Sequence, residues 1–265
     1  MEEITSAQNP LIKLVRSLSS RKHRTDLKLF AVEGAEYARK AKAHGYEPHL
    51  LILDGNRRAG GDIGEMIDWA RERGARILVV PPALMSRISG LNNPQALILV
   101  CRQRWAGDFA DAVPADAVVL ALDGIRDPGN LGTIMRTAEA ALVTRLWLIG
   151  QCCDPYSAET LRASAGSLFA MDILRLSQED ALARTARWPG DTIATEPAAV
   201  ENFRQTYRRP VLLLMGSESE GLNPALRGRA AKHVRIPMAP GVESLNVATA
   251  AALMLYELQY SSLPL

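Results

Sequence analysis

The chain has 265 residues with a formal net charge of +2, and 48% of its residues are hydrophobic and 23% charged. This balance is typical of a globular protein with a sizeable core, and it excludes disordered, collagen-like and coiled-coil chains. No apolar stretch reaches the roughly 18 residues that a membrane span needs. The acidic N-terminus lacks the basic and then apolar layout of a signal peptide, so we expect a cytoplasmic protein.

The charges are unevenly distributed along the chain. Residues 1–104 contain 17 lysines and arginines against 11 acidic residues, whereas residues 105–265 contain 14 against 18. The basic half begins with a group of cations that has only Asp26 as an acid among them: Lys13, Arg16, Arg21, Lys22, Arg24 and Lys28. The charge pattern alone fits either a surface that binds a polyanion or a solvated helix face.

The three cysteines and four histidines form no metal-binding pattern. Cys152 and Cys153 are adjacent, which is not the spacing of a zinc site, and Cys101 lies far from both in the sequence. The sequence therefore predicts neither a disulfide framework nor a metal site.

The first predicted domain is a small α/β domain of residues 1–104. Short apolar runs predict strands at residues 50–53, 77–80 and 96–101, and an amphipathic pattern predicts a helix at residues 64–73. Residues 105–116 have no clear periodicity and carry Gly, Pro and three Asp, so we interpret them as a linker.

The second predicted domain covers residues 117–265. Nearly all-apolar runs predict strands at residues 118–122, 146–149, 171–174, 192–195, 211–215 and 234–236. Helical patterns alternate with them, notably at residues 131–141, 178–187 and 247–259. This alternation indicates a parallel sheet with helices on both faces.

Polar loops follow three of these strands, at the sheet edge where parallel α/β folds bind ligands. They begin at Asp123, Gly216 and Pro237 and are rich in Gly, Pro, Asn, Ser and Glu. The loops contain no dinucleotide fingerprint, no phosphate-binding loop with its lysine and no nucleophile elbow, which weakens nucleotide-binding and hydrolase interpretations.

Together, the three loops resemble the signature motifs of the SpoU (TrmH) branch of the SPOUT RNA methyltransferases. Three groups of residues carry the resemblance: Asn130, Gly132, Arg136, Thr137 and Ala138; Gly216, Glu218, Gly221 and Leu222; Ile236, Pro237, Met238, Glu243, Ser244, Leu245, Asn246 and Val247. Ser219 departs from the pattern, because the family commonly has Gly there. Residues 4–10, the basic stretch and residues 30–34 look like the RNA substrate-binding domain often fused ahead of the catalytic domain.

The resemblance implies a parallel-sheet SPOUT domain with a trefoil knot, a feature that ordinary chains lack. It also implies S-adenosyl-L-methionine as the cofactor, bound by residues that match the knot loops: Gly216, Ile236, Leu245, Met238 and Thr195. Judged without the resemblance, Ile236 is an ordinary core residue. Relatives dimerise through the final helix, whose alanines permit close packing, so we expect a homodimer; packing of this helix on its own sheet is the alternative.

By the same resemblance, Arg136 is the central residue of ribose 2′-O-methylation, and four polar residues orient it and the ribose: Asn130, Glu218, Ser244 and Asn246. Because a guanidinium keeps its proton at neutral pH, a role for Arg136 in holding a phosphate and stabilising the alkoxide is favoured over a role as general base. A surface ion pair with Glu139 or Glu243 is the other interpretation of Arg136. Asn130 and Ser244 also suit helix N-caps.

The appended basic domain favours structured RNA, 23S ribosomal RNA first, as the substrate, with the six N-terminal cations contacting its phosphates. Transfer RNA is the alternative substrate. A non-catalytic RNA-binding or ribosome-assembly module, and self-protection against an antibiotic that targets the ribosome, are further alternatives. Methylation of proteins or small molecules fits the basic domain poorly.

Overall fold

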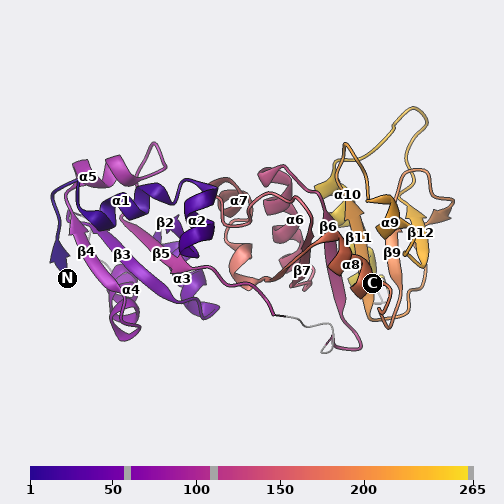
Figure 1. Cartoon of the computed structure of the whole chain (residues 1–265), viewed down its shortest axis with the longest axis horizontal. Helices are drawn as coiled ribbons and strands as arrows, with labels where there is room; N and C mark the ends of the chain where they lie inside the picture. The colour runs from indigo at the N-terminus through magenta and orange to yellow at the C-terminus, as the bar shows by residue number, and fades with distance from the viewer. Residues whose placement is uncertain (57–60, 108–112, 262–265) are drawn as a thin grey trace. The chain divides into compact units, whose positions relative to one another are not determined.

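A computed structural model describes residues 1–56, 61–107 and 113–261, and its chain divides into two compact units (Figure 1). The N-terminal unit comprises Met1–Arg104 and the segment Tyr156–Arg162. The C-terminal unit comprises Trp105–Pro155 and Ala163–Leu265. Residues 108–112 of the predicted linker lie outside the described residues.

The N-terminal unit is built on a five-stranded mixed sheet of order β1-β4-β3-β5-β2. The strands are β1 (Glu2–Glu3), β2 (Leu29–Glu33), β3 (Pro48–Asp54), β4 (Arg76–Val80) and β5 (Leu97–Arg102). β1, β4 and β3 are parallel, whereas β5 runs antiparallel to both of its neighbours. The predicted α/β character of this part is confirmed, and β2 is a strand that the sequence pattern missed.

Helices cover both faces of this sheet. The helices are α1 (Pro10–Ser17), α2 (Arg21–Leu27), α3 (Ala35–Ala43), α4 (Gly61–Glu72) and α5 (Pro82–Ile88). Ile12 of α1 and Met85 of α5 are fully buried in one core cluster with alternate residues of the strands, such as Leu50 and Ile52. Asn9 begins α1 by accepting a hydrogen bond from the backbone N–H of Leu11 at 2.9 Å.

The C-terminal unit contains a seven-stranded sheet of order β10-β12-β9-β11-β6-β7-β8, in which every pairing is parallel. The strands are β6 (Val118–Asp123), β7 (Arg145–Ile149), β8 (Asp172–Leu176), β9 (Thr192–Thr195), β10 (Glu201–Asn202), β11 (Val211–Gly216) and β12 (Lys232–Arg235). The predicted parallel sheet is confirmed. β10 was not predicted, and Ile236 lies just beyond the end of β12 rather than within it.

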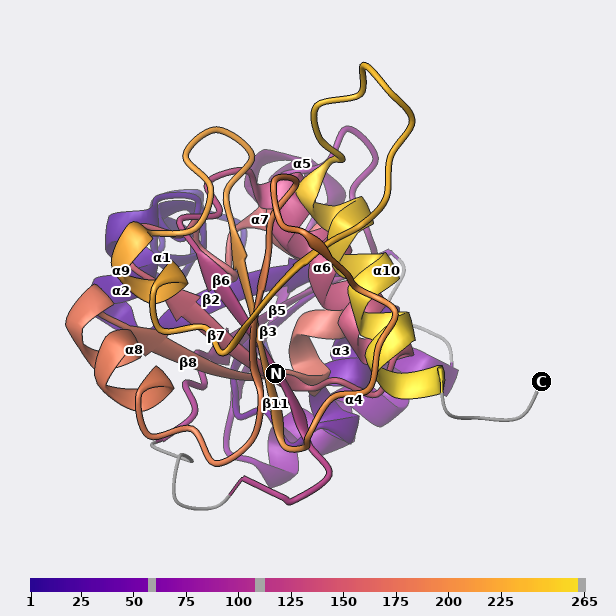
Figure 2. The same ribbon diagram turned by 90° about the vertical axis from the view of Figure 1, so that its right-hand side faces the viewer.

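Helices pack on both faces of this sheet as well. They are α6 (Pro128–Ala140), the 3-10 helix η2 (Ser167–Ala170), α8 (Gln178–Thr185), α9 (Pro224–Arg227) and α10 (Val247–Tyr260). The short helix α7 (Ala158–Ala163) belongs, except for its last residue, to the N-terminal unit. Figure 2 shows α8 and α9 on one side of the sheet and α6 and α10 on the other. Leu212 and Leu214 of β11 pack with the α8 and α9 side, because alternate side chains of a strand point to opposite faces.

Strand order explains why distant motifs meet. β11 lies between β9 and β6, and β12 pairs with β9, so the loops after β6, β9, β11 and β12 leave the same edge of the sheet. The last residues of two central strands are in register, with Gly216 opposite Asp123. Among the described residues, no helix is both long enough and apolar enough to cross a membrane.

Candidate active site

The first motif lies at the start of α6. Asp127 caps this helix and accepts a hydrogen bond from the backbone N–H of Asn130 at 2.6 Å. The interpretation of Asn130 as the cap is therefore wrong, because Asn130 is the third residue of the helix. Its side chain is left to make contacts outside α6.

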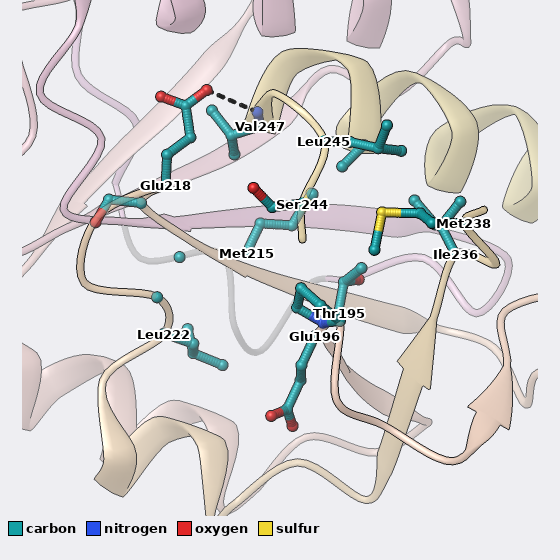
Figure 3. A pocket seen from close by; sticks show the side chains of 15 residues that line it. Thr195, Glu196, Met215, Glu218, Leu222, Ile236, Met238, Ser244, Leu245 and Val247 are labelled. Atoms are coloured by element: carbon teal, nitrogen blue, oxygen red, sulfur yellow. Dashed lines mark hydrogen bonds between the residues drawn. The ribbon is translucent and has the colours of Figure 1, made fainter. Parts of the chain in front are cut away.

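The side chains of Asn130, Glu218 and Asn246 form a closed hydrogen-bond network. Glu218 accepts from the Asn246 side-chain amide at 2.5 Å and from the Asn130 amide at 3.3 Å. The Asn246 amide also donates to the Asn130 carbonyl oxygen at 2.9 Å. The backbone N–H of Val247 donates to Glu218 at 3.0 Å (Figure 3). A carboxylate suits this position because each of its three partners is a donor.

Asn246 also caps α10. Its side-chain oxygen accepts hydrogen bonds from the backbone N–H groups of Ala248 and Thr249, at 3.0 and 3.3 Å. The interpretation of Ser244 as the cap is therefore wrong, because the helix begins two residues later than that interpretation requires. The cap and the network use opposite ends of one amide, so α10 fixes the orientation of Asn246 toward Glu218 and Asn130.

A pocket of about 160 Å³ opens beside this network, between the loops after β9, β11 and β12 (Figure 3). All five residues predicted to bind the cofactor line it, together with two of the predicted catalytic residues: Thr195, Gly216, Ile236, Met238, Leu245, Glu218 and Ser244. Arg136, Asn130 and Asn246 are not among the lining residues. The five predicted cofactor residues thus share one pocket with Glu218 and Ser244, whereas the other three predicted catalytic residues lie outside its lining.

The pocket has the chemistry that S-adenosylmethionine requires. In Figure 3, Ile236 and Met238 lie together on one side and offer apolar surface for an adenine ring, whereas Glu218 lies on the other. The hydroxyl of Thr195 is buried without a hydrogen-bond partner among the described residues. A buried hydroxyl is costly to leave unpaired, so a polar atom of a bound molecule is its natural partner.

Gly216 must be a glycine because the neighbouring backbone lies against it. A Cβ atom at this position would lie 2.0 Å from the carbonyl carbon of Gly221 and 2.1 Å from the backbone nitrogen of Leu222. Its φ is not in the left-handed region, so the requirement for glycine comes from the lack of space for a Cβ atom and not from the backbone conformation. Gly221, with φ of +68°, turns the chain back onto Gly216, and its N–H donates to the Ser217 carbonyl at 2.9 Å.

Glu196 is a pocket residue that the sequence analysis missed. It lines the pocket directly after β9, accepts from the Arg227 guanidinium at 2.7 Å and contacts the His233 ring nitrogen Nδ1. These contacts fix the carboxylate at the edge of the pocket. A polar residue directly after a predicted strand is the signal that would have identified it.

Arg136 projects from α6 as an exposed side chain. Neither of the ion pairs considered from sequence, with Glu139 or with Glu243, is present among the described residues. Arg136 also makes no hydrogen bond with the network of Asn130, Glu218 and Asn246. Its guanidinium is therefore available to a phosphate or a ribose.

The six predicted RNA-binding cations do not share one environment. Five are exposed: Lys13, Arg16, Arg21, Lys22 and Lys28. Arg24 is only 5% exposed and donates to the backbone carbonyls of Leu18 and Ser19 at 2.8 and 2.9 Å. Arg24 thus ties α2 to the end of α1, and this geometry argues against its predicted phosphate contact.

Within residues 1–56, 61–107 and 113–261, no three His, Cys, Asp or Glu side chains cluster as a metal site would require. Cys101 and Cys152 are buried, and burial raises the pKa of both thiols. Cys153 is half-buried.

Residues 117–256 match the SpoU rRNA Methylase family, and residues 9–99 match the MRM3-like substrate binding domain. The chain is 32% identical to the 23S rRNA (uridine(2479)-2′-O)-methyltransferase of Streptomyces viridochromogenes, over 91% of this chain and 85% of that protein. It is 28% identical to the 23S rRNA (guanosine(2553)-2′-O)-methyltransferase RlmP of Bacillus subtilis, over 98% of this chain and 100% of that protein. The structure of an AdoMet-bound rRNA methyltransferase from Sinorhizobium meliloti matches with a TM-score of 0.90 and 35% identity, and the match covers 99% of both chains.

Proposed function

The chain belongs to the SpoU rRNA methylase family, and from that premise we propose that it methylates a ribose 2′-oxygen of 23S ribosomal RNA. The observation that carries the proposal is that one residue from each of the three motifs joins a single hydrogen-bond network, formed by Asn130, Glu218 and Asn246. Asn130 and Asn246 are 116 residues apart in the sequence. This network borders a pocket whose lining suits S-adenosylmethionine.

S-adenosylmethionine supplies the methyl group, which it carries on a positively charged sulfonium sulfur. The apolar side chains of Ile236, Met238 and Leu245 would hold the adenosine part, and the Thr195 hydroxyl would gain a hydrogen-bond partner there. The Glu218 carboxylate at the other side lowers the electrostatic cost of a cationic ligand. Glu196 lines the pocket next to Thr195, and the ion pair with Arg227 holds its carboxylate in place.

The chain must also place a ribose hydroxyl in line with the methyl group and stabilise the oxygen as it loses its proton to solvent. Arg136 is exposed and unpaired among the described residues, so its guanidinium can bind the adjacent phosphate and stabilise the developing alkoxide. Asn130 is six residues earlier on the same helix and is held by Glu218. The network thus positions α6, and positioning of two reactants can contribute about 7–11 kcal/mol.

Ribosomal RNA is favoured as the substrate by the two relatives named above, which are named as 23S rRNA 2′-O-methyltransferases, and by the substrate-binding domain match over residues 9–99. Exposed cations of the N-terminal unit supply the electrostatic attraction that any RNA needs. Transfer RNA is the alternative substrate, and the test below compares methyl transfer to the two RNAs.

We also propose that the chain forms a homodimer through α10. Leu253 and Tyr256 are 42% and 48% exposed on this helix, which is unusual for large apolar side chains, and they border a surface hollow with Phe203. The trefoil knot that the family resemblance implies remains a prediction.

The test is transfer of a tritiated methyl group from S-adenosylmethionine to protein-free 23S rRNA, with tRNA as the competing substrate. We expect label in 23S rRNA, and loss of roughly three orders of magnitude in rate for Arg136→Ala, the scale that groups stabilising a transition state reach. Cofactor affinity of this variant, measured by calorimetry, should stay within about three-fold of wild type, since Arg136 does not line the pocket.

Arg136→Lys should be similarly impaired, because a point charge does not reproduce a planar fork of donors. Label in tRNA alone would contradict the substrate assignment. Cofactor binding without transfer to either RNA would favour a non-catalytic module.

A further inference from the structure

Three cations of the N-terminal unit line one surface groove. Lys13 and Arg16 are three residues apart on α1 and therefore share a helix face. Arg87 projects from the last turn of α5, and all three side chains line a groove of about 590 Å³, here called the α1–α5 groove. Within the described residues, none of the three makes an ion pair or a side-chain hydrogen bond.

The groove contains few acidic side chains that could neutralise these cations. Glu33 lies in the groove, but its two carboxylate oxygens accept from the Ser89 hydroxyl and from the backbone N–H of Gly90, each at 2.6 Å. This carboxylate fixes the loop after α5 and forms no ion pair with Arg87 among the described residues. Three cations against one hydrogen-bonded acid leave a positive groove that suits a chain of phosphates.

A second cavity adjoins the groove. It measures about 320 Å³ and shares Ala31, Glu33, Gly90 and Ala158 with the groove as lining residues. Its wall includes the half-buried ring of Tyr37 and the side chains of Leu91 and Leu161, and we call it the Tyr37 cavity. Glu36, Gln95 and Arg162 also line the cavity, so it combines apolar surface and an aromatic ring with polar groups that can bind the edge of a base. Such a cavity, next to a row of cations, suits an unstacked base of single-stranded RNA.

We propose that the α1–α5 groove holds the backbone of an unpaired RNA segment through Lys13, Arg16 and Arg87, and that the Tyr37 cavity receives one of its bases. The inference rests on the proposed function, which makes RNA the substrate. It selects Lys13 and Arg16 from the basic stretch and adds Arg87, which lies outside that stretch. Lys22 and Lys28 do not line the groove, although they are exposed and equally basic.

The test compares two triple variants of the full chain. Lys13→Gln/Arg16→Gln/Arg87→Gln removes the groove cations, and Lys22→Gln/Lys28→Gln/Arg73→Gln removes three exposed cations elsewhere in the same unit. The probe is a fluorescein-labelled single-stranded RNA of about 20 nucleotides, which is long enough to fill one such site. Its fluorescence anisotropy is measured over a salt series. We expect the groove variant to lose affinity by roughly ten-fold or more and its salt slope to fall by about 2, or 0.7 per lost contact.

The control variant should lose less than about three-fold in affinity, because only general attraction is weakened. Equal losses in the two variants, or none in either, would overturn the groove assignment. Tyr37→Ala should lower affinity for the single strand but not for a duplex of the same length, with the salt slope unchanged. Equal loss for both RNAs would overturn the base cavity.

Circular dichroism and thermal unfolding check that each variant is folded. The affinity for S-adenosylmethionine should match wild type, because the cofactor pocket belongs to the C-terminal unit. Failure of the proposed function is distinguishable: wild-type protein would then transfer no methyl group to RNA. A wild type that methylates 23S rRNA, with a groove variant that binds and methylates equally well, contradicts the groove alone.

Discussion

Replacing Gly216 with alanine tests how the pocket is built. The added Cβ would lie 2.0 Å from a backbone carbon of Gly221, and ordinary contacts begin at 3.4 Å. The Gly221–Leu222 backbone must therefore move by more than about 1 Å, since neither partner is a flexible side chain. Overpacking of this kind costs about 1–3 kcal/mol, and a clash with backbone belongs at the upper end.

The movement has a second consequence, because Gly221 and Leu222 line the pocket themselves. We expect Gly216→Ala to lower the free energy of unfolding by about 2–3 kcal/mol in a urea titration. In the protein that remains folded, calorimetry should show S-adenosylmethionine affinity reduced by roughly ten-fold or more, which is about 1.4 kcal/mol.

Gly190→Ala is the matched control. Its Cβ would lie 2.0 Å from the Pro210 carbonyl oxygen, an equally severe clash with backbone. Gly190 precedes β9, whereas the pocket lies at the other end of that strand, beyond Thr195. This variant should lose similar stability and keep its cofactor affinity. Wild-type stability in Gly216→Ala, or equal loss of affinity in both variants, would refute the reasoning.

Three further predictions follow from other parts of the fold. Glu218→Gln places an amide donor among three hydrogen-bond donors, so it should slow methyl transfer by roughly ten-fold or more. The control Glu220→Gln removes only a surface ion pair and should change the rate of methyl transfer less than about two-fold. Leu253→Glu/Tyr256→Glu should convert a dimer to monomers in analytical ultracentrifugation, and a wild type that is already monomeric would exclude the α10 interface. A thiol reagent should modify Cys153 rapidly in the native protein and the two buried cysteines only after denaturation; rapid modification of all three would contradict the burial described.

The sequence contains enough to predict the parallel sheet and the loops that meet at its edge. Strands such as β6 and β11 are apolar along their whole length because both faces are covered, and this pattern is visible without a structure. β2 was missed because it is short and is defined by its antiparallel pairing with β5, in which Phe30 lies opposite Cys101. Pairing between residues so far apart in the sequence leaves no local pattern.

The motif resemblance is confirmed as family membership, but it did not give the geometry of individual residues. Asp127, not Asn130, caps α6, because side chains at the start of a helix compete for the same backbone donors. Arg24 belongs to the same charge run as Lys22, and only the packing of α2 against the end of α1 shows that its guanidinium is buried. Charge patterns identify cations, whereas their partners depend on tertiary structure.

The central claim is that the pocket and its bordering network serve transfer of a methyl group to a ribose oxygen. The most direct measurement is mass spectrometry of nucleosides from 23S rRNA incubated with the protein and deuterated S-adenosylmethionine. We predict one nucleoside that carries the deuterated methyl group on its ribose with wild type, and none with Arg136→Ala. A deuterated methyl group on a base, or an unlabelled RNA despite tight binding of the cofactor, would contradict the account.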